Sequence, residues 1–487
     1  MYFRTTMKQM CIVIFIGLLG CQSSENTTKK FRHFDKESLI NDLNYLDDVL
    51  KRNHPGLYWH TEPTEIEQLK KRLQESISDS MTEPNFLKLI SEYNSVIRCV
   101  HTDIKPSKNY QLYLDSTKCY VPFGLIKIDN NYHVYRYLSY DSTLTQQPKI
   151  VSINGKPIEE IVEELLPRIP ADGKNDSRKY NVLQKQFNKY LAMFIFPGQT
   201  EYVLVVETEA KERQTFNVKG VDKDFYITKW NVEYGTSRQP PISFTTAKDN
   251  KVGVLTIRSF RNDLMDKFGI DFRDYLTTVF DSLEKSQIDK LIIDLRGNGG
   301  GYSEYGAQLI AFLSDTSFQY CQKMVLNSSE LDSRLKYDIP ETFADFPKGV
   351  VCPYNECLWA QHSVLGWRKP EQNIFKGKVV FLIDGGCVST TSEVATVAHR
   401  LKLGSFVGEE VGGSYQGDSG GVLGFATLPN TGIQVRIAVV KYVISEEDEF
   451  EGHGVIPKLL IKNSINEMNK EGDILLEKAH LVIDKLE

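Results

Sequence analysis

Several motifs that define common classes of enzyme and binding protein are missing from this chain of 487 residues. It contains no HExxH, which excludes a zincin-type hydrolase, and no Walker A sequence, which excludes a P-loop nucleotide site. Basic residues form no block, and the formal net charge of −6 argues against nucleic acid as a partner. With no cluster of metal ligands and no cofactor motif, the sequence predicts neither a metal ion nor a cofactor.

Long hydrophobic runs are also missing, apart from a short one near the N-terminus. The run Cys11–Gly20 follows two basic residues and is too short to span a bilayer, which is typical of a signal peptide. It ends in Leu18-Leu19-Gly20-Cys21, which resembles a bacterial lipobox. We therefore predict a signal peptide over 1–21, lipidation of Cys21, a tether over 22–34 and a membrane-anchored lipoprotein of the cell envelope, on the periplasmic side or the cell surface. An ordinary cleaved signal peptide or an uncleaved anchor is the alternative.

Cysteine is scarce, and six cysteines would remain after processing: Cys99, Cys119, Cys321, Cys352, Cys357 and Cys387. An exported protein can oxidise some of them, but six cysteines allow fifteen pairings, so the sequence predicts no particular disulfide. Cys352 and Cys357 lack the second ligand pair that a structural zinc site needs.

The remaining chain is long enough for two or three domains, and its hydrophobic content of 41% is that of a globular protein. Residues 35–98 carry apolar positions at helical spacing in three segments, which predicts a small helical bundle in an N-terminal helical region of residues 35–118. Residues 119–244 favour short strands. Within them, Ile150–Ile158 contains a strand and an Asn-Gly turn before a helix, and this resembles part of a PDZ-like module, which binds chain ends by strand addition. An ordinary hairpin and helix is the alternative.

From residue 245 to 487 strands alternate with helices, which predicts an α/β core with some parallel strands. Residues 320–375, rich in turn-forming residues, are expected to be an insertion. The most informative stretch of this core is a buried strand, Leu291–Leu295, followed by the glycine-rich loop Arg296–Gly301. Such a loop presents backbone N–H groups that stabilise an anion, and we expect Asp294 and Arg296 to brace it.

A second loop, Asp384–Glu393, also follows an apolar strand and opens a helix. Ser389 or Thr390 could simply cap that helix. The alternative is a nucleophile whose oxyanion is stabilised by the next N–H group and the helix dipole. If the two strands are neighbours, Ser389 faces Gly299 and Gly300, whose amides would form an oxyanion hole together with the N–H of Thr390.

These two loops, with Gly408-Glu409 and Gly454-Val455-Ile456-Pro457, resemble the tail-specific, or C-terminal processing, serine peptidases. That family also includes the tricorn core protease and the interphotoreceptor retinoid-binding modules. The resemblance implies a ClpP/crotonase-like α/β catalytic core after an N-terminal helical bundle and a PDZ-like α+β region. It also implies an exported endopeptidase with a polypeptide substrate, and it implies no oligomeric state.

The same resemblance implies the catalytic residues. Gly408 follows Ser389 by 19 positions, the interval of the family, which favours Ser389 over Thr390 and Ser392 as the nucleophile. The processing branch has a lysine where this chain has Ser414. The tricorn-like branch instead implies His101 as the general base, with Glu451 acting through a hydroxyl network.

Two further readings of the sequence remain. The segment Gly417–Gly421 spells the nucleophile motif of chymotrypsin-like proteases, but the α/β pattern opposes that fold, and we expect a glycine-rich turn near the active site. The missing lysine also keeps open a non-catalytic peptide- or ligand-binding lipoprotein on the same scaffold, and the same oxyanion hole would serve an acyl esterase.

Overall fold

The computed structural model describes residues 31–138, 144, 147–208, 210–235, 239–247, 251–353, 356–461 and 472–486. The predicted signal peptide, Cys21 and most of the tether lie outside the described residues. Within the described ranges, no helix combines the length and the apolar character needed to cross a membrane.

The N-terminal region is helical, as its periodicity predicts. Its helices are α1 (Lys36–Asn53), α2 (Pro63–Ser76), α3 (Glu83–Ile90), α4 (Asn94–Ile97) and α5 (Lys108–Ser116), and β1 (His33–Phe34) pairs with β2 (Met81–Thr82). Helix α1 begins where Asp35 accepts a hydrogen bond from the Ser38 amide at 2.8 Å. Its apolar residues at helical spacing, Leu39, Leu43, Leu46 and Leu50, are all buried. The third predicted helix divides into α3 and α4 around a 3₁₀ turn.

The middle region is an antiparallel sheet with three helices. The order is β4-β5-β6-β8-β9, with β7 beside β6, and the strands are β4 (Gly124–Ile128), β5 (Asn131–Tyr135), β6 (Lys149–Ile153), β7 (Lys156–Pro157), β8 (Glu201–Glu207) and β9 (Arg213–Lys219). Helix α6 (Ile158–Leu165) follows the predicted Asn154-Gly155 turn, where both residues have positive φ. Helices α7 (Asp176–Tyr190) and α8 (Lys223–Tyr234) were not predicted.

Helix α7 lies directly against β4, an edge strand of this middle sheet. Phe187 stacks on Phe123 with ring centroids 6.2 Å apart. The backbone carbonyl of Gln184 would stand 2.0 Å from a Cβ on Gly124, so only glycine allows this approach. The edge strand β4 is therefore in close backbone contact with the protein's own helix.

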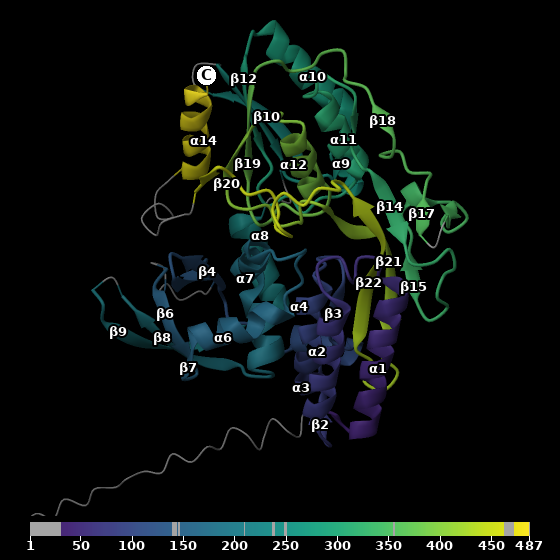
Figure 1. Ribbon diagram of the computed structural model, residues 1–487. Helices are drawn as coiled ribbons and strands as arrows, with labels where there is room; N and C mark the ends of the chain where they lie inside the picture. Colours follow the sequence, from purple (N-terminus) through teal and green to yellow (C-terminus); the bar gives the residue numbers. More distant parts are fainter. Residues whose placement is uncertain are drawn as a thin grey trace, which may run out of the picture.

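The α/β core has a six-stranded sheet in the order β10-β11-β12-β19-β20-β23, which confirms the predicted fold class. Its strands are β10 (Ile242–Ala247), β11 (Val252–Ile257), β12 (Lys290–Asp294), β19 (Lys378–Ile383), β20 (Ser405–Gly408) and β23 (Leu459–Leu460), and all pairs are parallel except β10 with β11. Figure 1 shows α14 (Ile474–Lys485) on one side of this sheet and α9 (Asn262–Lys267), α10 (Phe272–Lys285), α11 (Ser303–Ala311) and α12 (Thr390–Arg400) toward the other. Ile292 packs toward α14, while Leu291 and Ile293 join the larger cluster, which explains the continuous apolar run of β12.

A second sheet joins the core to the helical region. Its order is β15-β21-β22-β14-β17-β16, with β3 beside β22, and the strands are β3 (Asp103–Lys105), β14 (Lys323–Leu326), β15 (Lys336–Asp338), β16 (Val350–Val351), β17 (Cys357–Trp359), β21 (Gly417–Thr427) and β22 (Gln434–Val443). The hairpin of β21 and β22 runs alongside α1 (Figure 1). The predicted insertion thus supplies four strands of this sheet, and β13 (Phe318–Gln319) pairs separately with β18 (Trp367–Arg368). Cys352 and Cys357 form a disulfide.

The prediction of a glycine-rich turn at Gly417–Gly421 is wrong, because this segment begins strand β21. Backbone pairing with β22 needs no side chains, and the register shifts after Gly420, where Gly421 has a φ of 65°.

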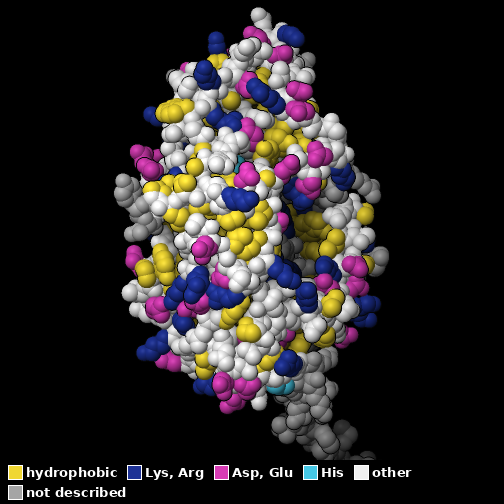
Figure 2. Space-filling view, turned by 90° about the vertical axis from the view of Figure 1, so that its right-hand side faces the viewer, with side chains coloured by type: hydrophobic (Ala, Val, Ile, Leu, Met, Phe, Trp, Pro, Cys, Tyr) yellow, Lys and Arg dark blue, Asp and Glu magenta, His cyan; other side chains and the backbone are white. Residues whose placement is uncertain are grey.

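On the face of the molecule in Figure 2, side chains of both charges are interspersed around a recess at mid-height, the level at which the core meets the N-terminal regions in Figure 1.

Candidate active site

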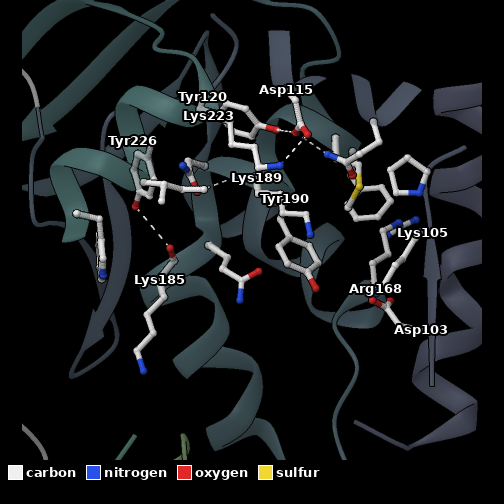
Figure 3. Close-up of a pocket in the computed structure, with 18 of the residues that line it drawn as sticks. Asp103, Lys105, Asp115, Tyr120, Arg168, Lys185, Lys189, Tyr190, Lys223 and Tyr226 are labelled. Carbon is white, nitrogen blue, oxygen red and sulfur yellow. Dashed lines mark hydrogen bonds and ion pairs between the residues drawn. The ribbon is translucent and has the colours of Figure 1, made fainter. Parts of the chain in front are cut away.

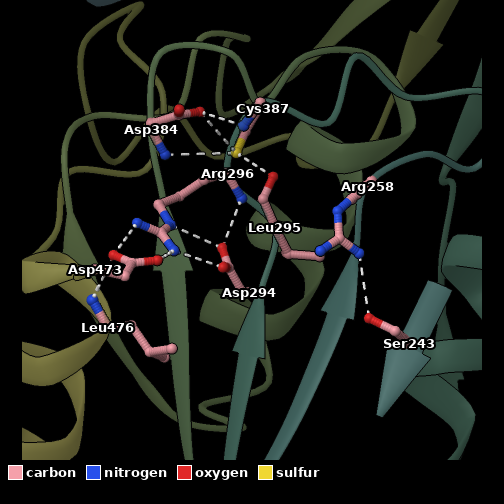
Figure 4. Close-up of polar contacts among 10 residues, drawn as sticks. Ser243, Arg258, Asp294, Leu295, Arg296, Asp384, Cys387, Asp473 and Leu476 are labelled. Carbon is pink, nitrogen blue, oxygen red and sulfur yellow. Dashed lines mark hydrogen bonds and ion pairs between the residues drawn. The ribbon is translucent and has the colours of Figure 1, made fainter. Parts of the chain in front are cut away.

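The glycine loop after β12 is held by ion pairs on both sides. The Arg296 guanidinium binds Asp294 at 2.6 and 2.9 Å and Asp473 of the segment before α14 at 2.6 and 2.9 Å (Figure 4). These carboxylates raise the pKa of Arg296 despite its burial. Asp384 Oδ1 accepts hydrogen bonds from the amides of Gly297 and Gly386, both at 2.8 Å, so the loop is also tied to the second glycine loop. Asp294 and Arg296 brace the loop, as expected.

Because β12 and β19 are parallel neighbours, the two loops lie side by side, as the sequence predicts. A Cβ on Gly300 would stand 2.7 Å from Ser389 Cβ and 3.0 Å from the Thr390 amide nitrogen. Asn298 connects the loops further, since its carbonyl accepts from the Val388 amide at 3.3 Å. Only a glycine at position 300, with its φ of 88°, permits this contact.

Ser389 differs from the two neighbouring hydroxyl residues. It has a φ of 57° and a ψ of −134°, a strained conformation for a residue with a side chain, and it makes no side-chain cap to α12. The hydroxyl of Thr390 donates to the Gly301 carbonyl at 3.0 Å, and that of Ser392 donates to the Ser389 carbonyl at 2.8 Å. Among the described residues, the Ser389 hydroxyl has no hydrogen-bond partner, and its side chain is partly exposed.

The structure corrects one of the three expected oxyanion donors. The Gly300 amide donates to Asn298 Oδ1 at 2.9 Å, so it is already engaged. Asn298 is itself buried, with its Nδ2 bound to the Ile257 carbonyl at 3.0 Å, which holds this arrangement in place. The amides of Gly299 and Thr390 have no acceptor among the residues described, and they remain available to an anion.

His101 lies in the turn before β3, close to strand β21. Its carbonyl accepts from Arg436 Nε at 2.8 Å, and its Nδ1 would be 3.5 Å from a Cβ on Gly420. Burial, with the positive charges of Arg436 and Arg178, lowers the pKa of His101 to about 3. The ring is therefore neutral at physiological pH. Its buried Nδ1 has no hydrogen-bond partner, and no hydrogen bond joins the ring to Ser389.

Asp172, which sequence reasoning missed, connects the His101 segment to the serine turn. Its Oδ1 accepts from the Val100 amide at 2.8 Å. A Cβ on Gly413 would stand 3.6 Å from Asp172 Oδ2 and 2.3 Å from Ser392 Oγ. The turn that carries His101 and the turn that carries Ser389 are thus neighbours, although their residues are almost 300 positions apart in sequence. No motif marks Asp172, because its role arises from contacts made only in the folded chain.

Glu451 is not bound to either proposed catalytic residue. It lies in an exposed turn with a φ of 53°, and its carboxylate has no hydrogen bond or ion pair within the described part of the chain. Its loop does contact the segment after Asp172, since the Gly452 carbonyl accepts from the Lys174 amide at 2.8 Å.

The buried acids near the serine turn are different residues, Asp172, Glu393 and Asp418. Burial raises the pKa of all three carboxyl groups, and each has one carboxylate oxygen without a partner. Ser414, which stands where the processing branch has lysine, is also buried, with an unpartnered hydroxyl. No three or more His, Cys, Asp and Glu side chains in the described ranges are arranged to hold a metal ion.

Comparison with known proteins identifies the class. Residues 251–461 match peptidase family S41. Two solved structures, mature CPAF and mature CPAF complexed with lactacystin, are similar in fold, with TM-scores of 0.63 and 0.62 and 14% sequence identity in each case. The similarity covers 92% of this chain and 96% and 97% of theirs. No curated protein matches the sequence. The match over residues 251–461 supports a serine-type peptidase of the tail-specific kind.

Proposed function

We propose that the protein is an exported endopeptidase in which Ser389 is the nucleophile and His101 the general base. The observation that carries this proposal is the free Ser389 hydroxyl, beside two unengaged amides and at the start of α12. The neighbouring hydroxyls of Thr390 and Ser392 are already donated to backbone carbonyls.

In the first step, Ser389 Oγ attacks the scissile carbonyl and its proton passes to the His101 ring. The oxyanion of the tetrahedral intermediate accepts hydrogen bonds from the Gly299 and Thr390 amides, with support from the N-terminus of α12. Protonated His101 then donates its proton to the leaving amine as the C–N bond breaks, which leaves an acyl-Ser389. Water, deprotonated by His101, hydrolyses that ester and restores the serine. We keep Glu451 as a supporting residue of the proposal, to be tested by substitution.

Labelling with a fluorophosphonate tests the nucleophile. We expect the wild type to react and Ser389→Ala to be silent. Ser419→Ala is the matched control, because Ser419 belongs to the chymotrypsin-like motif on β21, and this variant should label normally. Equal labelling of the wild type and Ser389→Ala would overturn the assignment, and loss in Ser419→Ala alone would move the nucleophile to β21.

A binding protein without catalysis is the second candidate, and two observations favour it. Ser414 replaces the family lysine, and no hydrogen bond connects His101 to Ser389 in the structure. Turnover of casein-derived peptides by wild type, His101→Ala and Glu451→Gln separates the candidates, because a binding protein cuts none of them. Comparison of ester with peptide turnover tests the third candidate, an acyl esterase.

We also propose that the protein is anchored to the cell envelope through lipidated Cys21. The Cys352–Cys357 disulfide supports export, because disulfides persist in oxidising compartments. Labelling of cells with a fatty-acid probe should mark the wild type and not Cys21→Ser, which should leave the membrane fraction. A Cys21→Ser variant that is still labelled and sedimented would contradict the anchor.

A further inference from the structure

A cavity of about 480 Å³ lies between the helical region and the middle region, and Ser389 is not among its lining residues. Strand β3 and helix α5 form one wall, and α7 and α8 form the other. In Figure 3, Lys189 and Tyr190 project from α7 into the space between these walls. The volume is in the range of sites that bind small molecules or short peptide segments.

Cations outnumber anions in the lining of this cavity, with five lysines and arginines against two aspartates. Two of the cations are neutralised locally. Lys223 pairs with Asp115 at 2.7 Å, and Arg168 pairs with Glu92 at 2.9 Å. The excess positive charge therefore belongs to the other three.

Those three are Lys105, Lys185 and Lys189, and none has an acceptor for its ammonium group among the described residues. Burial and the nearby positive charge of Arg436 lower the pKa of Lys105. Asp103 in the same lining provides one negative charge near Lys105 and Lys189, which are half-buried, while Lys185 is exposed. One carboxylate does not balance three ammonium groups, so an anionic ligand would be stabilised here. Three ammonium groups call for more than one negative charge.

The cavity also adjoins the proposed catalytic residues at two places. Lys105 belongs to β3, which begins two residues after His101. At the other wall, Lys185 Nζ would be 3.8 Å from a Cβ on Gly297, in the glycine loop. A polypeptide substrate bound across the active site could therefore place one of its segments in this cavity. Aromatic rings in the lining, including Tyr190 and Trp230, supply apolar surface for such a segment.

We propose that this cavity is a specificity site that binds an acidic segment of the polypeptide substrate, with carboxylate side chains on Lys105, Lys185 and Lys189. The inference rests on the proposed peptidase function for the identity of the ligand as a substrate. Acidic side chains fit better than a single chain-terminal carboxylate, because one carboxylate leaves two of the three ammonium groups unpaired.

Binding is measured first in the Ser389→Ala protein, so that no cleavage occurs. The probes are fluorescein-labelled, C-terminally amidated peptides that differ only in Glu against Gln, and the readout is anisotropy. We expect the Glu peptide to bind at least about ten-fold more tightly, with an affinity that falls as salt rises, because exposed ion pairs are screened. Lys105→Gln/Lys189→Gln should remove most of this difference. Lys219→Gln on β9, an exposed position that does not line the cavity, is the matched control and should keep it.

Equal affinity for the Glu and Gln peptides in the parent protein would overturn the proposal. So would a Gln peptide with a free C-terminus that binds as tightly as the amidated Glu peptide, because the site would then read a chain end. Salt dependence in the parent protein provides a test that needs no folded lysine variant.

Turnover by the wild type separates this inference from the proposed function. A preference for the Glu peptide in binding, without any cleavage, contradicts the peptidase mechanism and leaves the cavity assignment standing. Cleavage with equal kcat/KM for Glu and Gln substrates contradicts the cavity assignment and leaves the mechanism standing.

Discussion

Replacement of Gly300 by alanine should disable the proposed site far more than the same change at Gly299, one position earlier. At Gly300 the φ of 88° costs a residue with a side chain roughly 1–2 kcal/mol. The added methyl would stand 2.7 Å from Ser389 Cβ and 2.8 Å from the Val388 carbonyl oxygen, so the serine turn has to move. Overpacking of this kind costs roughly a further 1–3 kcal/mol.

We therefore expect Gly300→Ala to lower the free energy of unfolding by about 3 kcal/mol. We also expect it to lower kcat/KM by about 100-fold, since a shift of roughly 1 Å in a reacting group has that effect. Gly299 has no positive φ and no heavy atom within 4 Å of its would-be Cβ, so Gly299→Ala keeps the amide and adds no clash. Its stability should change by about 0.5 kcal/mol or less.

Urea unfolding followed by circular dichroism measures stability, and hydrolysis of a fluorogenic peptide measures kcat/KM. Fluorophosphonate labelling at matched concentration reports on Ser389 in both variants. The reasoning is refuted if Gly300→Ala is as stable and active as Gly299→Ala, because the contact with Ser389 would then carry no energy. Equal losses in the two variants would refute it as well.

Three further predictions concern charge. Arg296→Gln should lower the free energy of unfolding, measured in urea, by about 2 kcal/mol, because it leaves a buried carboxylate unpaired. Arg261→Gln removes an exposed ion pair and should lower it by about 0.5 kcal/mol or less. Equal losses in the two variants would contradict this prediction. Burial raises the pKa of Glu393 in the folded protein, so the free energy of unfolding should fall as the pH rises above the ordinary carboxyl pKa of 4.5. Glu393→Gln should flatten this pH profile between pH 5 and 8, and an unchanged slope in the variant would contradict the prediction. Because the pKa of His101 is lowered to about 3, kcat/KM should fall at acid pH only well below 6.5, the ordinary pKa of histidine. Arg436→Gln should move this acid limb to higher pH, and a wild-type acid limb near pH 6.5 would contradict the prediction.

Local patterns predicted the parts of the fold that depend on short stretches of sequence. The apolar spacing in α1 predicts its buried face, and the continuous apolar run of β12 predicts a strand that is buried on both faces. Helix α7 was not predicted, because its sequence is mostly polar and lacks a continuous apolar face at helical spacing. The turn predicted at Gly417–Gly421 was wrong, because glycines that favour turns in isolation form a strand here by pairing with β22.

Local sequence patterns were enough to predict two glycine loops after two buried strands, and a serine at the start of the helix after the second. These features are local, since strand, loop and cap each follow from residues within about ten positions. Which hydroxyl group stays free, and which backbone amides stay without an acceptor, depends on long-range contacts in the folded chain. The bonds that engage Thr390 and Asn298 join residues up to 89 positions apart, and Asp172 reaches the His101 turn across 72. Such contacts depend on how the strands are ordered in the sheets, which no short stretch of sequence specifies.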